Sequence, residues 1–308
     1  KRPFSKQSPH KIGDFKGDVK DFALVVPVPV VLKKNDIKVV EKSVFTMFDS
    51  YSSPRIVEYF DNNPCQQYLY DTEVAYYSMS VKDVNGSSDV LQSLKKNKVK
   101  IEAKYTVGEY DILILSAEES TGLEDWLNEN GYKIPSGAKE VLEPYIKSNM
   151  KFFVVKANLD EMKKINTISL RPIQINLESP KFMLPIRLGM ANAGSSQDMI
   201  VYALSKTGRV ETTNYPTLKM PTDNKVPEFT ANVFGKFYQD LWKKNLKTKG
   251  MNNVFLEYAW DISMSQFVFC DPCTGTPPQI QDMMTAGVNW LQYSDKYNSY
   301  LGNVHFTR

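Results

Sequence analysis

The three cysteines are the residues of this chain with the most distinctive chemistry. Cys270 and Cys273 form a Cys-Asp-Pro-Cys motif, and Cys65 lies far upstream of it. A CxxC spacing is compatible with thiol–disulfide exchange, with zinc binding or with a structural disulfide. An odd number of cysteines in an oxidised, exported chain leaves one thiol free or paired outside these residues.

The surroundings of the motif favour the structural role over the other two. An exchange cysteine should lie at a helix N-terminus, where the helix dipole lowers the thiol pKa. The residues after Cys273 are Thr-Gly-Thr-Pro-Pro, which delay the next predicted helix to about Pro278. Zinc needs four ligands, and the two histidines are poorly placed to complete a set with Cys65. We therefore predict that three residues are structural disulfide partners: Cys65, Cys270 and Cys273. We predict no catalytic, cofactor-binding or metal-binding residue.

Other kinds of chemistry have little support in the sequence. His10 and His305 both lie in terminal segments, where a fixed general base is hard to maintain. The chain has no Gly-x-Ser-x-Gly motif, no phosphate-binding loop and no dinucleotide-binding glycine pattern. With 38 Lys and Arg against 35 Asp and Glu, the net charge of +3 gives no reason to expect a nucleic-acid partner.

A cluster of tyrosines offers a second kind of candidate site. These residues could form an aromatic surface that binds a protein or a polymer. Aromatic residues on strands are more often part of the core, so exposure of several on one face would be needed to favour binding. The candidates are Tyr68, Tyr70, Tyr76 and Tyr77.

The order of the helices and strands expected from the sequence predicts an α+β fold with mixed, mainly antiparallel sheets. These elements must position the residues named above. Apolar periodicity predicts one long amphipathic helix near 227–247, and a capping-box spacing from Thr121 to Glu124 predicts a helix over 121–130 that ends before Gly131. The apolar run at 111–115 predicts a strand buried on both faces. Further strands are expected at 21–32, 66–81, 99–107, 151–159, 170–177, 181–190, 198–210, 253–262 and 266–270, and further helices at 42–51, 54–60, 135–146 and 278–286.

The length of the chain is typical of two domains. The expected division is an N-terminal α+β half, 1–160, and a C-terminal α+β half, 161–308, unless the two form one intertwined unit. The longest apolar run, FALVVPVPVVL at 22–32, is about half of the ~20 residues that a membrane-spanning helix needs, so no transmembrane segment is expected.

Several motifs in combination resemble a known family. They are VKDFALVVPVPVVL (19–32), DSYSSPRIVEYFDNNPC (49–65), GEYDILILSAEESTGLEDWLNENGYKIP (108–135), KFFVVKANL (151–159), EYAWD (257–261) and CDPC (270–273). With these motifs the chain resembles the uncharacterised bacterial family called domain of unknown function 2330. The resemblance implies an exported protein made with a signal peptide, and it brings no activity with it.

The chain departs from the family pattern at both ends. Family members usually open the mature region with a cysteine followed by glycine and an aromatic residue, and they continue beyond the last residues present here. The resemblance therefore implies a chain shortened at both ends, whose missing opening would supply a fourth cysteine.

These observations together predict a non-catalytic, exported structural or protein-interaction component of a bacterial cell envelope. Its expected place is extracytoplasmic, in the periplasm, at the outer membrane or at the cell surface, within a larger assembly of envelope proteins. A lipid anchor outside these residues is compatible with this prediction. The alternative is a thiol–disulfide oxidoreductase, or another extracytoplasmic enzyme, that uses Cys270 and Cys273.

Overall fold

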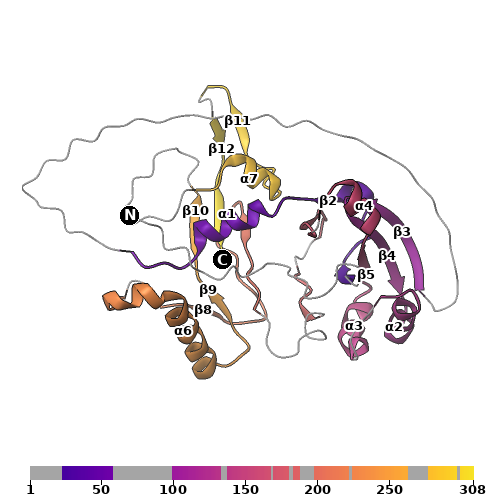
Figure 1. Cartoon of the computed structure of the whole chain (residues 1–308), viewed down its shortest axis with the longest axis horizontal. Helices are drawn as coiled ribbons and strands as arrows, with labels where there is room; N and C mark the ends of the chain where they lie inside the picture. Colours follow the sequence, from indigo (N-terminus) through magenta and orange to yellow (C-terminus); the bar gives the residue numbers. More distant parts are fainter. Residues whose placement is uncertain are drawn as a thin grey trace, which may run out of the picture. The chain divides into compact units, whose positions relative to one another are not determined.

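The structure is a computed structural model of an α+β protein with mainly antiparallel sheets (Figure 1). It describes residues 23–57, 99–132, 137–167, 169–179, 183–187, 198–221, 224–262, 277–296 and 299–308. Their contacts form two compact units, which interleave along the chain. The four-stranded unit contains the described residues of 23–44 and 99–200, and the three-stranded unit contains those of 45–57 and 201–308. The division expected at residue 160 stays a prediction.

The four-stranded unit is built on one antiparallel sheet, in the order β1-β5-β4-β3. β1 (Ala23–Val28) lies at an edge of this sheet, which suits Pro27 because proline cannot donate a hydrogen bond to a second neighbouring strand. β5 (Lys151–Ala157) and β4 (Tyr110–Ala117) are the central strands, and β3 (Val99–Val107) is the other edge. The expected strands at 99–107 and 111–115 are thereby confirmed, and those at 21–32 and 151–159 are confirmed over the shorter spans of β1 and β5.

Both faces of this sheet are covered, as the apolar run of β4 predicted. Ile112 and Ile114 are fully buried in one cluster with Phe153 of β5. On the opposite face, Leu115 packs with Leu123 of the first covering helix, α2 (Ser120–Glu129), in a cluster to which α3 (Ala138–Lys147) also contributes. Each fully buried aliphatic side chain contributes about 1.5 to 3 kcal/mol. The two clusters hold the sheet between two apolar layers.

The predicted helix near 121–130 is confirmed, but its N-terminal cap is not. α2 begins at Ser120, and the N-cap residue is Glu119, whose side chain accepts no capping hydrogen bond. At the other end Gly131 has a φ of +71°, and the next amide, that of Tyr132, donates to the carbonyl of Leu127. This is the glycine-terminated geometry that the sequence predicted.

Smaller elements complete this unit. β2 (Ile37–Val39) pairs with β6 (Ile173–Ile175), after a short 3-10 turn η2 (Lys34–Asp36). α4 (Leu159–Lys164) follows β5 at once, because the side chain of Asn158 accepts hydrogen bonds from the first amides of the helix. The strand expected at 181–190 is wrong where it can be checked, since residues 183–187 contain no strand.

The three-stranded unit contains a second antiparallel sheet, in the order β10-β13-β7. β13 (Val304–Thr307) lies between β10 (Ala259–Ile262) and β7 (Ala203–Ser205). Phe306 is fully buried and makes ring contacts with Phe48 and Tyr51 of α1 (Ser43–Ser52). The helix expected at 42–51 is confirmed. The helix expected at 54–60 is wrong in its described part, because residues 54–57 are not helical.

The long amphipathic helix near 227–247 is also present in this unit, although its first part is a 3-10 helix. η3 (Glu228–Val233) leads into α6 (Phe234–Lys249), which lies beside the parallel pair of β8 (Thr217–Lys219) and β9 (Val254–Leu256). Trp242 packs on Phe255 with ring centroids 5.1 Å apart. The expected short helix at 278–286 is α7 (Ile280–Thr285), followed by a hairpin of β11 (Gln292–Ser294) and β12 (Ser299–Leu301).

Candidate functional site

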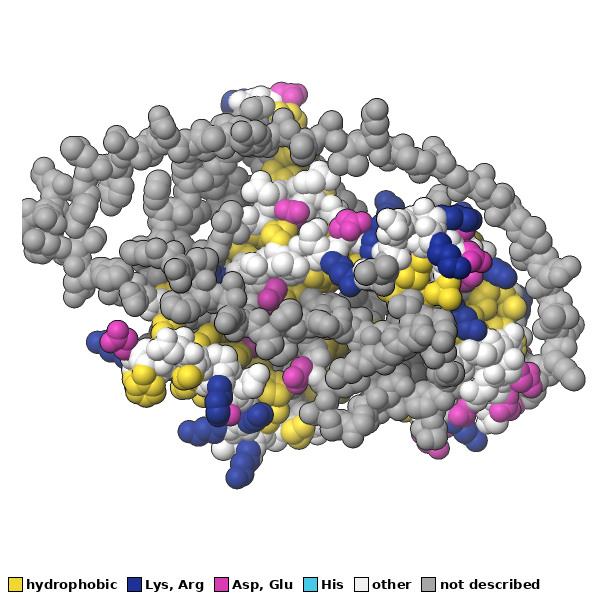
Figure 2. All heavy atoms as spheres, in the orientation of Figure 1, with side chains coloured by type: hydrophobic (Ala, Val, Ile, Leu, Met, Phe, Trp, Pro, Cys, Tyr) yellow, Lys and Arg dark blue, Asp and Glu magenta, His cyan; other side chains and the backbone are white. Residues whose placement is uncertain are grey.

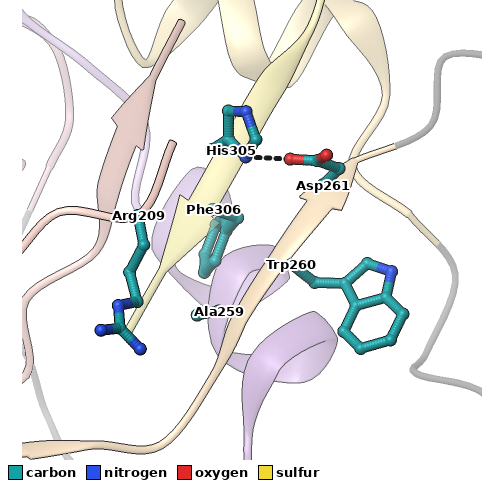
Figure 3. A pocket seen from close by; sticks show the side chains of 6 residues that line it. All are labelled: Arg209, Ala259, Trp260, Asp261, His305 and Phe306. Atoms are coloured by element: carbon teal, nitrogen blue, oxygen red, sulfur yellow. Dashed lines mark ion pairs between the residues drawn. The ribbon is translucent and has the colours of Figure 1, made fainter. Parts of the chain in front are cut away.

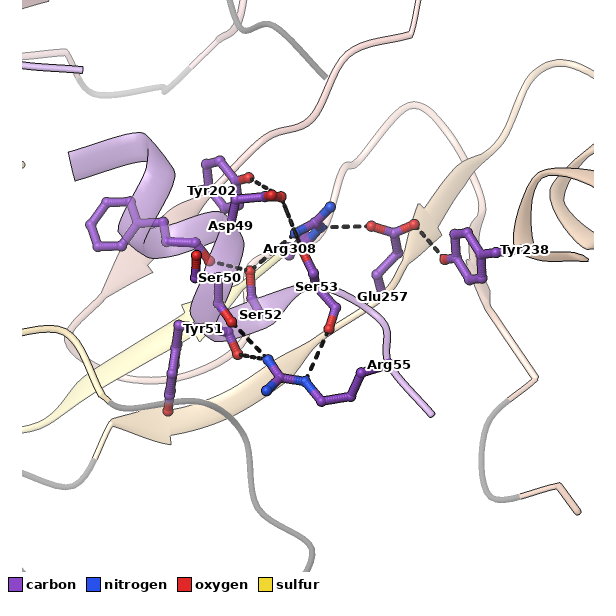
Figure 4. A network of polar contacts seen from close by, with 11 residues as sticks. Asp49, Ser50, Tyr51, Ser52, Ser53, Arg55, Tyr202, Tyr238, Glu257 and Arg308 are labelled. Carbon is purple, nitrogen blue, oxygen red and sulfur yellow. Dashed lines mark hydrogen bonds and ion pairs between the residues drawn. The ribbon is translucent and has the colours of Figure 1, made fainter. Parts of the chain in front are cut away.

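A group of charged side chains in the three-stranded unit is centred on Arg308, which directly follows β13 (Figure 4). The Arg308 side chain is only 7% exposed. Its Nε donates to Glu257 at 2.7 Å, and its Nη1 donates to Asp49 at 2.8 Å. The guanidinium therefore joins the segment between β9 and β10 to the C-terminal part of α1. We call this group the Arg308 network.

The end of α1 supplies further acceptors to the Arg308 network. Nη1 also lies 2.9 Å from the hydroxyl of Ser53, and that hydroxyl donates to Asp49 at 3.0 Å. The hydroxyl of Ser52 donates to the carbonyl of Phe48 in the preceding turn. Ser52 thus makes the hydrogen bond to the preceding turn that is common for serine in a helix, and Ser53 links Asp49 to the guanidinium.

Two tyrosines close the Arg308 network at its sides. The hydroxyl of Tyr202 donates to Asp49 at 3.1 Å, and that of Tyr238 donates to Glu257. Burial raises the pKa of both phenols, and the neighbouring carboxylates raise it further. For Arg308, burial alone would lower the pKa, but the electrostatic interactions with Glu257, Tyr202 and Asp49 and the hydrogen bond to Glu257 together outweigh it, and the pKa is raised. Arg308 is therefore charged and both phenols are protonated at neutral pH.

Arg55 holds the last turn of α1 from outside the network. Its Nη2 donates to the carbonyls of Ser50 and Tyr51, at 2.8 and 2.9 Å. A cation that donates to the last carbonyls of a helix also complements the negative end of the helix dipole.

The chemistry of the Arg308 network is that of a structural clamp. A nucleophilic hydroxyl needs an adjacent general base that is itself oriented by a third group. In the part of the chain that the structure describes, His305 pairs with Asp261, and no hydroxyl is hydrogen-bonded to its ring. The serines of the network are hydrogen-bonded to Arg308, Asp49 and a backbone carbonyl instead.

A shallow, solvent-open hollow of about 610 Å³ lies over β10 and β13 (Figure 3). It is lined by Arg209, Ala259, Trp260, Asp261, His305 and Phe306. The expectation that His305 lies in a loose terminal segment is wrong, because β13 is the central strand of its sheet and His305 is ion-paired to the cross-strand Asp261. Trp260 is 70% exposed at the edge of the same sheet. The hollow is a surface with an aromatic edge rather than an enclosed catalytic cavity.

The four-stranded unit has a polar centre of its own. Glu109, in the turn between β3 and β4, is fully buried, and Arg171 donates to its carboxylate through the backbone amide, Nε and Nη2. Burial alone would raise the pKa of Glu109, but the hydrogen bonds from Arg171 outweigh it and the pKa is lowered. Arg171 also reaches Glu41. All of these interactions are internal to the unit, so this pair joins segments of the unit and offers no open site.

The residues singled out from the sequence mostly lie outside the described part of the chain. This holds for the three cysteines, for the four tyrosines and for His10, so their predicted roles stay predictions: Cys65, Cys270, Cys273, Tyr68, Tyr70, Tyr76, Tyr77 and His10. Within the described residues, no three His, Cys, Asp or Glu side chains gather as metal ligands would. None of the described helices is long and apolar enough to cross a membrane.

Sequence reasoning missed the Arg308 network altogether. Asp49, Glu257 and Arg308 are far apart in the chain and stand in no motif of known chemistry. The sequence held one weak signal of such a network. Buried multidentate ion pairs favour arginine over lysine, and the chain has only six arginines, so each of them was a candidate for such a pair. Two of those six, Arg171 and Arg308, form the centres described above.

Comparison with known proteins places the chain in a family. The sequence profile of a family described as uncharacterized proteins conserved in bacteria, DUF2330, matches residues 9–307. No curated protein and no solved structure matches the chain. The match covers nearly the entire sequence, which confirms the resemblance drawn from the motifs. The chain therefore belongs to the DUF2330 family of bacterial proteins.

Proposed function

We propose that this chain is a non-catalytic, exported protein-interaction component of a bacterial cell envelope. The observation that carries the proposal is Trp260, a large aromatic side chain that is 70% exposed on β10, an edge strand. Edge strands offer backbone groups to an added strand, and exposed aromatic residues are common anchors of protein interfaces.

The polar groups of the described residues support binding rather than catalysis. The two charged centres, at Arg308 and at Glu109, are engaged in contacts inside their own units. The open hollow beside Trp260 places an imidazole against a carboxylate but brings no nucleophile to them. A broad surface with one prominent aromatic residue is typical of association with another macromolecule.

The proposal can be tested by cross-linking in the native envelope. A photoreactive amino acid is introduced at position 260, and in a matched variant at Tyr293, another exposed aromatic position on a strand. We expect position 260 to give a discrete cross-linked species, identifiable by mass spectrometry, that position 293 does not give. Equal labelling from both positions, or recovery of a lone monomer under gentle extraction, would overturn the proposal.

The alternative function is a thiol–disulfide oxidoreductase that uses Cys270 and Cys273. Its support is the CxxC spacing alone, because both residues lie outside the described part of the chain. Counting reactive thiols across a series of redox buffers separates the two functions. A catalytic pair would be reduced at a much higher potential than a structural disulfide, which resists the glutathione pool.

A further inference from the structure

The segment formed by η3 and α6 has one face packed against the protein and another that carries exposed apolar side chains. On the packed face, the ring of Trp242 contacts that of Phe255 at a tilted angle, and Tyr238 donates to Glu257. Even so, no residue of α6 is fully buried. The exposed apolar side chains are Phe229, Val233 and Phe237, at 70%, 49% and 37% exposure.

The exposed apolar residues share their face with lysines. Positions separated by seven residues lie on the same side of an α-helix, which groups Phe237 with Lys244, and Lys247 lies one turn after Lys244. Phe229 and Val233 precede α6 in the 3-10 helix η3. α6 contains five lysines and one aspartate. The aspartate, Asp240, is ion-paired to Lys236, so the cationic excess lies in the second half of the helix. We call this surface the α6 face: Phe229 and Val233 of η3, and Phe237, Lys244 and Lys247 of α6.

The surface view shows the same arrangement. Dark blue lysine side chains cover the end of α6, and yellow hydrophobic side chains lie beside them toward η3 (Figure 2). A helix with exposed aromatic residues on one side and lysines around them is typical of segments that lie in a membrane interface. The apolar side chains enter the boundary of the acyl chains, while the lysines contact anionic headgroups.

The combination of aromatic and basic residues selects among anionic partners. A nucleic acid would use the lysines through its phosphates and would leave Phe229 and Phe237 in water. An anionic bilayer uses both kinds of side chain at once, because its headgroups are charged and its acyl region is apolar.

We propose that the α6 face docks on the surface of a bilayer that contains anionic lipid. The contact is peripheral, since it involves the side of one helix and no spanning segment. This inference uses residues other than Trp260 and holds whether or not the proposed protein partner exists.

The proposal is tested by co-sedimentation of the full chain with vesicles. One set contains phosphatidylcholine with phosphatidylglycerol, and the other contains phosphatidylcholine alone. We expect binding to the first set only, weakening as salt is raised. Each Lys→Gln substitution at Lys244 or Lys247 should weaken the partition coefficient about fivefold, and the double variant F229S/F237S should weaken it at least about tenfold.

Matched controls lie on other elements of the same chain. Lys163 of α4 is 78% exposed, so K163Q removes one exposed lysine charge from an element other than α6. Y293S removes an exposed aromatic residue from β11. Both controls should bind vesicles as the unaltered chain does, and circular dichroism should show that every variant retains its helix content.

Three outcomes would overturn the proposal. Equal binding to vesicles with and without phosphatidylglycerol would show that the lysines do not contribute through anionic headgroups. Binding that falls with the lysine variants but not with F229S/F237S would indicate a general polyanion site. Sedimentation of a dimer that F237S converts to a monomer, without any vesicle binding, would show that a second copy of the chain covers this face. A negative vesicle result leaves the cross-linking test at position 260 unaffected.

Discussion

Replacing Arg308 by methionine tests whether the Arg308 network is a structural clamp. Methionine keeps an unbranched apolar side chain but removes the donors to Glu257 and Asp49. The Glu257 side chain is 14% exposed and would stay in place as a charge without its cationic partner, whereas Asp49 at 40% exposure can be hydrated. Breaking a buried ion pair costs about 3 to 5 kcal/mol. Because only Glu257 is strongly shielded, we expect a loss of about 3 kcal/mol for R308M.

Urea denaturation followed by tryptophan fluorescence measures this loss. Three of the four tryptophans, Trp242, Trp260 and Trp290, lie in the three-stranded unit and report on it. With a denaturant slope of about 2 kcal/mol per M, the midpoint for this unit should fall by about 1.5 M.

Two further variants make the Arg308 test specific. R209M breaks an ion pair with Glu211 in which both side chains are about half exposed, so it should cost less than about 1 kcal/mol. R308M/E257Q removes the stranded charge and should recover part of the loss. The clamp is refuted if R308M is no worse than R209M, or if the double variant is no more stable than R308M.

Three other predictions concern the four-stranded unit and the region after α7. Because the pKa of Glu109 is lowered, its ion pair stabilises the fold fully above the ordinary carboxyl pKa, and this stabilisation is lost as the pH falls through the lowered pKa. E109Q should therefore be less stable than the unaltered chain at neutral pH. The urea midpoints of the two proteins should converge as the pH is lowered. F153A, at a fully buried position of β5, should cost about 3 to 5 kcal/mol by calorimetry, whereas a loss below about 1 kcal/mol would contradict the assigned core. Gly302 has a φ of +136°, and an added Cβ would lie 2.8 Å from Leu291, so G302A should lower the thermal midpoint, and an unchanged midpoint would count against this geometry.

The long elements of the protein follow from local patterns in the sequence. The apolar run of β4 requires burial on both sides, and the structure places it in the middle of a covered sheet. Pro27 restricts β1 to an edge because proline has no backbone donor, and Gly131 ends α2 because glycine can adopt the positive φ of the terminating turn. These constraints act within a few residues, so they can be predicted without knowing what the segment contacts.

The short strands are decided by their partners and were therefore predicted less well. β6 and β7 have three residues each, in regions where longer strands were expected. A strand ends where its neighbour ends, and the sequence does not show which distant segment that neighbour is.

The sequence by itself determined the class of fold, the family and the absence of familiar catalytic motifs. Only the tertiary structure decided the clamp, because Asp49 on α1, Glu257 after β9 and Arg308 after β13 meet through packing of segments that are far apart in the chain. The same is true of His305. Its position is fixed because β13 pairs with β10, which places Asp261 beside the imidazole. Periodicity reports which face of an element is apolar, but contacts between charged side chains depend on where whole elements come to rest.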